Sequence, residues 1–267
     1  MADPLDLSGK VAVVTGGCRG IGRAITGRFL RAGADVVICC RNEPGELPAA
    51  GGHQAAFVAA DVREVDDIDR VVSFTVERHR RLDILVNNAG GSPPAPAATA
   101  SPRFSAAIVS LNLLAPLNFA QRANAVMQEQ PEGGAIVNVG SVSGLRPSPG
   151  TAAYGAAKAG LVNLTATLAV EWAPKVRVNC VSAGLVLTDQ APLHYGDEAA
   201  VAAVGATVPM GRMAEPEEIA DVCLFLASPL ARYVSGENVV VHGGGERPAF
   251  LRGAAPGGGT PLRGAGC

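Results

Sequence analysis

The sequence predicts a doubly wound α/β fold, in which a parallel sheet of about seven strands carries helices on both faces. Short runs that are apolar at every position alternate with stretches in which apolar residues recur every three to four positions. Strands of that kind, separated by helices, are typical of a parallel sheet buried on both sides, and right-handed crossovers leave few other topologies. Residues 1–247 hold no internal repeat and no linker, so we expect a single domain there.

The first unit consists of a strand, a glycine turn and a helix. The apolar run 11–14 leads into T-G-G-C-R-G-I-G at 15–22, and Ile21, Ile25 and Phe29 then follow at helical spacing. Glycines let the backbone turn tightly and let a pyrophosphate approach the N–H groups at a helix N-terminus. The turn therefore suggests a dinucleotide site, although an ordinary glycine-rich loop before a helix would look the same.

The other elements alternate in the same way, and Pro116 predicts a kink in the longest helix. Because ligands bind at the carboxyl ends of the strands in such sheets, we expect the glycine turn, Asp61, 87–90 and Ser141 at one edge. The expected strands are 34–40, 54–62, 82–86, 135–139, 176–181 and 238–241, and the expected helices are 65–79, 104–128, 152–172 and 216–227.

Composition narrows the function classes. The 267 residues are 48% hydrophobic and 17% charged, with a formal net charge of −2, which gives no sign of a nucleic-acid partner. The first ten residues hold neither a basic nor an apolar segment, and no uncharged apolar run reaches the roughly 18 residues of a membrane span. We expect a cytoplasmic protein that binds no membrane. Residues 248–267 contain six glycines and three prolines without periodicity, which predicts a mobile C-terminal tail.

The six cysteines, at positions 18, 39, 40, 180, 223 and 267, form no C-x-x-C pair, and Cys39 and Cys40 lie within a predicted strand. We interpret them as small buried thiols rather than as disulfides or metal ligands, and we expect no metal site.

Three residues indicate acid/base chemistry. Tyr154 and Lys158 are four residues apart on a predicted helix, so their side chains share one face. A nearby ammonium favours the phenolate and lowers the tyrosine pKa from its ordinary value of about 10, which prepares the phenol for proton transfer to a carbonyl oxygen. Ser141, at the end of the preceding strand, can hydrogen-bond the same oxygen.

Together these motifs resemble the short-chain dehydrogenase/reductase family, and within it the 3-oxoacyl-carrier-protein-reductase-like branch. The glycine turn, N-N-A-G at 87–90, a serine thirteen residues before the tyrosine, and Y-x-x-x-K occur in the family's order. The resemblance implies a Rossmann-like NADP-binding catalytic domain over 1–247. It also implies the catalytic roles of Asn112, Ser141, Tyr154 and Lys158, in which Tyr154 is the general acid/base, Ser141 orients the substrate oxygen, Lys158 also holds the nicotinamide ribose and Asn112 supports a water relay.

The resemblance further implies a set of cofactor-binding residues along the carboxyl edge of the sheet. Two positions depart from the family pattern: Ala183-Gly184 replaces Pro-Gly after the sixth strand, and His242 replaces an aspartate after the last. We expect a looser turn at the first and a structural variation at the second. The implied cofactor residues are Gly16, Arg19, Gly20, Ile21, Gly22, Arg41, Asp61, Val62, Asn88, Ala89, Gly90, Tyr154, Lys158, Gly184 and Thr188.

The end of the second strand favours NADP(H) over NAD(H). An NAD site of this type needs a carboxylate there to accept from the ribose 2′-hydroxyl, and the strand instead ends at Cys40 followed by Arg41. Arg41 and Arg19 match the family's NADP-type pattern, and a planar guanidinium suits a phosphate. Glu43 is the nearest carboxylate, but it lies beyond the strand end.

The loops expected around the nicotinamide, 91–102, 143–151 and 185–210, are mainly apolar, which suits a ketone or secondary alcohol with an oxoacyl or alicyclic body. Arg146 either meets an anionic group or is a solvated surface charge. The segment 187–208 is expected to close over the substrate. The apolar residues of these loops are Leu145, Pro147, Pro149, Leu185, Val186 and Leu193, joined by His194 and Tyr195.

We expect an NADP(H)-dependent oxidoreductase that assembles as a homotetramer, or otherwise as a dimer, through the alanine-rich helix 152–172. Two alternatives stay open. A regulatory or sensor protein could bind NADP on the same fold without catalysis, and a purely structural α/β domain would need no site. Either would be expected to have lost Tyr154 or Lys158, which this chain keeps.

Overall fold

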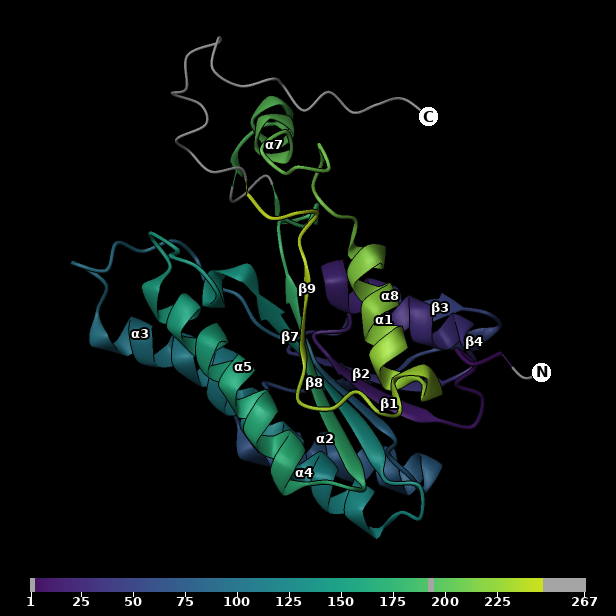
Figure 1. The fold of residues 1–267 in the computed structure, drawn as a ribbon. Helices are drawn as coiled ribbons and strands as arrows, with labels where there is room; N and C mark the ends of the chain where they lie inside the picture. Colours follow the sequence, from purple (N-terminus) through teal and green to yellow (C-terminus); the bar gives the residue numbers. More distant parts are fainter. Residues whose placement is uncertain (1–2, 192–194, 247–267) are drawn as a thin grey trace, which may run out of the picture.

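The computed structural model describes residues 3–191 and 195–246. Its centre is a seven-stranded parallel sheet with the order β5-β2-β1-β6-β7-β8-β9 (Figure 1). This confirms the doubly wound sheet. The strands are β1 (Val11–Thr15), β2 (Asp35–Cys40), β5 (Ala56–Ala59), β6 (Ile84–Asn87), β7 (Gly134–Ser141), β8 (Val176–Ala183) and β9 (Asn238–Val241).

Helices cover both faces of the sheet and divide its core into two. On one face α1 (Gly20–Arg31) and α8 (Pro216–Ala227) pack against the sheet. On the other face lie α2 (Val65–His79), α4 (Ala115–Glu129) and α5 (Ala152–Glu171). Successive residues of a strand point to opposite faces, so Ile38 of β2 faces α1 whereas Cys39 lies in the other core.

The longest predicted helix is interrupted. After α3 (Pro102–Val109), one π-helical turn, Ser110–Leu114, leads into α4. Pro116 has no N–H to donate to the preceding turn, so the regular ladder cannot run through it, and the expected kink takes the form of a π-bulge. The bulge places the buried Asn112 beneath the carboxyl edge of the sheet.

By length and composition alone, the helical stretch Pro102–Glu129 is apolar enough to cross a membrane, although the sequence analysis predicted no such run. Packing accounts for part of this apolarity, because Phe119, Ala120 and Ala123 are buried against the sheet.

Two elements were not predicted. A short antiparallel hairpin, β3 (Ala49–Ala50) and β4 (His53–Gln54), turns through Gly51 and Gly52, which have φ angles of 61° and 82°. Gln54, the first residue of the strand expected at 54–62, belongs to this hairpin instead, and the observed strand of the main sheet is the shorter β5. The helix α7 (Glu198–Gly205), whose first turn is capped by Asp197, lies within the segment expected to close over substrate.

The expectation that every cysteine is a free thiol is wrong for two of them. Cys18 and Cys40 form a disulfide with a Cα–Cα distance of 6.6 Å. Side chains alternate between the two faces of the sheet along β2, so Cys40 lies on the same face as Ile38, the face that α1 covers. The glycine turn crosses that face, which brings Cys18 to Cys40. The remaining described cysteines, Cys39, Cys180 and Cys223, are buried thiols as expected, and Cys267 lies outside the described residues.

Candidate active site

The glycine turn has a shape that larger residues would destroy. Gly16 and Gly20 have φ angles of 67° and 50°, which favour glycine. A Cβ on Gly22 would lie 2.2 Å from the carbonyl oxygen of Gly16, and one on Gly20 would lie 3.6 Å from the Thr188 side chain. The turn at Gly20 therefore faces the side chain of Thr188, in the loop after β8, where Thr188 is implied to bind the carboxamide.

The end of β6 is fastened to the end of β1 by side-chain hydrogen bonds. The Asn88 amide donates from Nδ2 to the Thr15 carbonyl oxygen at 2.9 Å, and the Thr15 hydroxyl accepts from the backbone N–H groups of Asn88 and Ala89 at 2.9 and 3.0 Å. Asn88 thus holds the N-N-A-G segment beside the glycine turn, which is the position that the resemblance implies.

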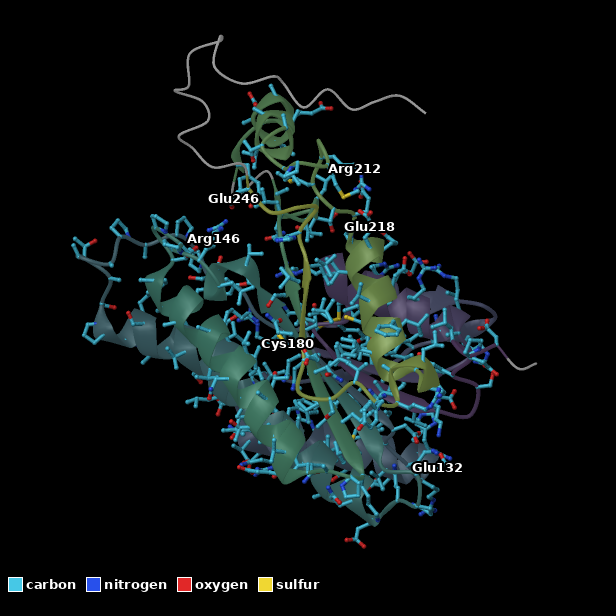
Figure 2. The ribbon with its side chains drawn as sticks, in the orientation of Figure 1. Glu132, Arg146, Cys180, Arg212, Glu218 and Glu246 are labelled. Atoms are coloured by element: carbon cyan, nitrogen blue, oxygen red, sulfur yellow. A yellow bond between two sulfur atoms is a disulfide. The ribbon has the colours of Figure 1, made fainter. Side chains whose placement is uncertain are left out.

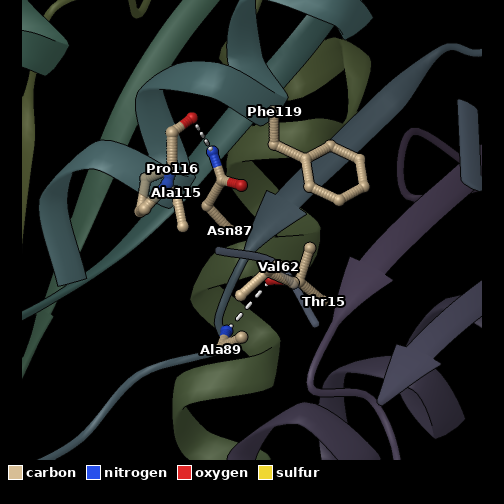
Figure 3. Close-up of a pocket in the computed structure, with 7 residues that line it drawn as sticks. All are labelled: Thr15, Val62, Asn87, Ala89, Ala115, Pro116 and Phe119. Atoms are coloured by element: carbon tan, nitrogen blue, oxygen red, sulfur yellow. Dashed lines mark hydrogen bonds between the residues drawn. The ribbon is translucent and has the colours of Figure 1, made fainter. Parts of the chain in front are cut away.

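Next to this junction is a small, shallow hollow (Figure 3). Val62, implied to contact the adenine, lines it. Asp61 does not line it. The Asp61 carboxylate accepts from the Arg63 Nε at 2.9 Å, and its hydrogen bonding to Arg63 is the main reason that its pKa is lowered. The residues lining the hollow are Thr15, Val62, Asn87, Ala89, Ala115, Pro116 and Phe119.

Both arginines of the expected 2′-phosphate site are exposed at the same edge. Arg41 follows β2 directly and lies close enough to Asp61 to contribute to the lowering of that carboxyl's pKa. Arg19 is the residue before α1 and has an extended backbone, with φ −152°. The disulfide partners Cys18 and Cys40 each precede one of them.

The residues present fit a dinucleotide. As the resemblance implies, the glycine turn would hold the pyrophosphate, Arg19 and Arg41 would meet the adenosine end, and Thr188 would meet the carboxamide; a Cβ on Gly22 would lie 2.2 Å from the Gly16 carbonyl oxygen, so the turn needs glycine there. Within residues 3–191 and 195–246, no cluster of three or more His, Cys, Asp or Glu side chains could hold a metal ion.

Tyr154 and Ser141 meet where β7 ends and α5 begins. The Ser141 hydroxyl lies close enough to the Tyr154 side chain to lower the tyrosine pKa. Burial acts in the opposite direction and is stronger, so the pKa of Tyr154 is raised. The expected lowering by Lys158 is not found in this structure.

Lys158 explains the difference. Its side chain is buried, its Nζ lies 5.7 Å from the centre of the Tyr154 ring, and it donates to the Val139 carbonyl oxygen at 2.7 Å. Burial lowers the pKa of Lys158 to about 8. The ammonium is therefore directed at a backbone carbonyl rather than at the phenol oxygen, and its own charge is weakened at alkaline pH.

Asn112 acts on the loop after β6. Its side chain hydrogen-bonds to the main chain of Gly91 and donates to the Ile108 carbonyl oxygen at 2.9 Å. A Cβ on Gly90 would lie 2.7 Å from the Asn112 Oδ1 and 3.4 Å from the Lys158 Nζ, so these three residues adjoin. A relay through Asn112 stays a prediction.

The two positions that depart from the family pattern, Ala183 and His242, lie on either side of a close contact. Gly184 donates from its N–H to the Val241 carbonyl oxygen at 2.8 Å, and a Cβ there would lie 2.8 Å from the His242 Cα. His242 therefore packs on the turn after β8. A structural role for His242 stays a prediction.

On the substrate side, Arg146 is a partly exposed charge that pairs with Glu246 at the surface, and the sequence analysis did not single out Glu246 (Figure 2). Tyr195 lies close enough to influence Tyr154, whose pKa it helps to raise. Leu193 and His194, expected in this pocket, lie outside the described residues.

A row of buried polar side chains supports the site, and sequence analysis missed it. Asn87 donates to the Asn138 Oδ1 at 2.9 Å, and Asn138 donates to the Thr165 Oγ1 at 2.9 Å, which ties β6 and β7 to α5. A signal for it was present, since Asn138 interrupts an otherwise apolar strand.

The fold and this site define an oxidoreductase of the Rossmann type. Residues 16–246 match the family model described as enoyl-(acyl carrier protein) reductase. The chain belongs to the short-chain dehydrogenase/reductase family, whose members use a nicotinamide cofactor.

Individual proteins and solved structures that are similar to this chain support the same family. The chain is 36% identical over 247 residues to a 3-oxoacyl-acyl-carrier-protein reductase of Thermotoga maritima, covering 89% of this chain and 98% of the relative. A short-chain type dehydrogenase/reductase from Mycobacterium marinum superposes with a TM-score of 0.83 at 31% identity, covering 91% and 97% of the two chains. Thermoplasma acidophilum aldohexose dehydrogenase in ligand-free form gives 0.84 at 29% identity, covering 96% and 98%.

Proposed function

We propose that this protein is an NADP(H)-dependent oxidoreductase that interconverts a ketone and a secondary alcohol on a mainly hydrophobic small molecule, with Tyr154 as general acid/base. The observation that carries the proposal is the grouping of Ser141, Tyr154 and Lys158 at the carboxyl edge of the sheet: Ser141 is near enough to lower the pKa of Tyr154, and the Lys158 Nζ lies 5.7 Å from the centre of the Tyr154 ring. When bound, the cofactor supplies or accepts the hydride.

Two hydroxyls that meet at one point suit an oxygen. A carbonyl oxygen placed between Ser141 and Tyr154 accepts from both, and the charge that develops on it during reduction is stabilised where it forms. Tyr154 then transfers its proton to that oxygen, and in the oxidation direction it accepts the proton from the alcohol. Ser141 keeps the oxygen within reach of the phenol and retains its own proton.

The raised pKa of Tyr154 favours the proton donor, which is the form that ketone reduction needs. Lys158, whose Nζ lies 5.7 Å from the centre of the Tyr154 ring, can replace the proton, because burial brings its pKa to about 8. A lysine with that pKa can release and recover a proton near neutral pH at small cost.

The NADP(H) preference rests on Arg19 and Arg41, which are exposed at the adenosine end, and on the absence of a carboxylate between 38 and 41. The nearby carboxylate Asp61 is engaged by Arg63, which leaves Arg41 to meet a 2′-phosphate. An oxoacyl substrate is supported by the Thermotoga maritima relative, which is named as a 3-oxoacyl reductase.

The outer face of α5 supports a homo-oligomer. This helix is apolar nearly all round, and its exposed positions are largely small residues such as Ala156, Ala159 and Ala166, ending in Val170, which is 80% exposed. A helix that is apolar on every side is normally buried, so a second copy of the chain is expected to cover this face in a cytoplasmic dimer or tetramer.

Loss of NADPH absorbance tests the proposal with a panel of simple, alicyclic and oxoacyl-thioester ketones. Turnover of a ketone is expected, with a higher kcat/KM for NADPH than for NADH. An enoyl thioester belongs in the same panel, because the matched family model is named for an enoyl reductase. Turnover of the enoyl compound alone would overturn the carbonyl assignment, and NADPH binding without any turnover would favour the sensor alternative.

A further inference from the structure

The Cys18–Cys40 disulfide joins the two segments that carry the proposed 2′-phosphate site. Cys18 lies in the glycine turn directly before Arg19, and Cys40 ends β2 directly before Arg41. A single covalent bond thus fixes the chain next to both arginines.

Two further contacts between the turn and β2 lie upstream of Cys18. The Gly16 N–H donates to the Cys39 carbonyl oxygen at 2.8 Å, and Gly17 packs so closely on Ile38 that a Cβ would lie 2.5 Å from that side chain. Arg19 itself makes no side-chain capping bond to α1. The disulfide is therefore the tie to β2 nearest to Arg19.

Among the described cysteines, this pair is the one open to redox chemistry. Cys18 and Cys40 are half-buried at the edge of the sheet, whereas the other three are fully buried. Burial raises the pKa of Cys39 to about 12 and also raises the pKa of Cys180 and Cys223. The thiolate is the reactive form of cysteine, so these three thiols are inert.

We propose that Cys18–Cys40 is a reversible disulfide that sets the affinity of the site for the 2′-phosphate of the cofactor. This inference rests on the NADP(H) preference proposed above. A thiolate of a dithiol attacks one sulfur, the S–S bond breaks and one cysteine thiolate leaves; the second thiol then displaces the other cysteine. The dithiol becomes a cyclic disulfide, and two electrons and two protons pass to the protein. A disulfide oxidant reverses the exchange.

Reduction weakens phosphate binding by releasing the arginines. With the disulfide closed, both arginines are held at one separation before the cofactor arrives. With the disulfide open, the turn samples other conformations, and only a fraction of the molecules can bind the phosphate at any moment. The apparent affinity is the intrinsic affinity multiplied by that fraction, so if a tenth of the molecules remain able to bind, the dissociation constant rises about tenfold. NADH has no 2′-phosphate, so its affinity changes much less.

The experiment measures the Kd of NADPH and of NADH by fluorescence titration of the full chain after oxidation with glutathione disulfide and after reduction with dithiothreitol. Thiol titration of the unfolded protein gives the redox state, and circular dichroism verifies the fold in both. We expect NADPH binding to weaken about tenfold on reduction and to recover on reoxidation. The double variant Cys18→Ser/Cys40→Ser should bind NADPH like the reduced protein at every redox state. Cys39→Ala, on the opposite face of β2, should keep the response.

The outcomes separate the two proposals. Equal affinities for NADPH and NADH in the oxidised protein would overturn the NADP(H) preference and the switch with it. A preserved preference with the same NADPH affinity in both redox states would overturn the switch alone. The switch would also be overturned if all six cysteines still titrated as free thiols after oxidation. It would be overturned as well if the NADPH affinity of the Cys18→Ser/Cys40→Ser variant still changed between the oxidising and reducing conditions. Because the wild-type chain is compared with itself, the result does not depend on the double variant folding.

Discussion

The side chain of Asn112 hydrogen-bonds to both the N–H and the carbonyl oxygen of Gly91. Its Oδ1 accepts from the Gly91 N–H at 2.9 Å, and its Nδ2 donates to the Gly91 carbonyl oxygen at 3.0 Å. This pair joins the π-helical turn to the loop that follows N-N-A-G, so the position of one wall of the site depends on a single buried amide.

Asn112→Ala should reduce kcat by about tenfold to a hundredfold, because leaving a buried backbone group unpaired costs about 1–3 kcal/mol and loosens the loop. Asn112→Asp keeps the acceptor, loses the donor and should fall between alanine and wild type. Steady-state kinetics at saturating cofactor would measure the effect. A wild-type kcat in the alanine variant would show that these hydrogen bonds to Gly91 are irrelevant to turnover.

Tyr154→Phe should lower kcat by about a hundredfold to ten-thousandfold, the usual contribution of a positioned general acid. The Kd of NADPH should change little, since the ring remains in place. Tyr233→Phe is the matched control, because Tyr233 is fully exposed. A Tyr154→Phe enzyme that kept most of its kcat would remove this phenol from the mechanism.

Arg41→Asp should weaken NADPH binding by about tenfold to a hundredfold and improve NADH binding. A charge-assisted hydrogen bond contributes about 1.5–3 kcal/mol, and the new carboxylate can accept from a ribose hydroxyl. Arg31→Asp, an exposed position at the far end of α1, makes the same change of charge away from the site. If both variants changed the NADPH Kd equally, the effect would be one of net charge and not of a phosphate contact.

The pKa of Lys158 predicts how stability varies with pH. It is about 8 in the folded protein and 10.5 in an unperturbed lysine. Between these values the unfolded chain holds the proton and the folded chain does not, so unfolding takes up a proton and stability rises with pH. Relative to Lys158→Met, the wild-type free energy of unfolding should increase from pH 8 to 10.5, by at most about 1.4 kcal/mol per pH unit. Urea denaturation of both proteins at pH 7.5 and 9.5 would measure it, and an equal difference at both values would contradict it.

Ala159→Glu should break the assembly, because it places a carboxylate on the exposed apolar face of α5. Light scattering at micromolar concentration would report a smaller species than wild type. Ala199→Glu, exposed on α7, is the control for the added charge. A wild-type protein that is already monomeric would rule out the oligomer.

Sequence patterns predicted the elements that local spacing determines. The helix at 216–227 has the expected bounds, and β9 does too, because each shows one unbroken period. The hairpin at 49–54 escaped prediction because two-residue strands have no period. Features that depend on contacts between distant parts of the chain could not be predicted from the sequence. Whether Cys40 or Cys39 pairs with Cys18 depends on which face of β2 the turn crosses. The direction of the Lys158 ammonium depends on the Val139 carbonyl, nineteen residues away in sequence.

The buried row Asn87–Asn138–Thr165 has a consequence for how the molecule opens. Helix α5 carries both Tyr154 and Lys158. If it separated from the sheet, the hydrogen bond between Asn138 and Thr165 would break and leave buried polar groups without a partner. We therefore expect α5, β6 and β7 to open together as one cooperative unit. The amide protons of the segment that carries the acid/base pair are then expected to be among the last of the chain to exchange.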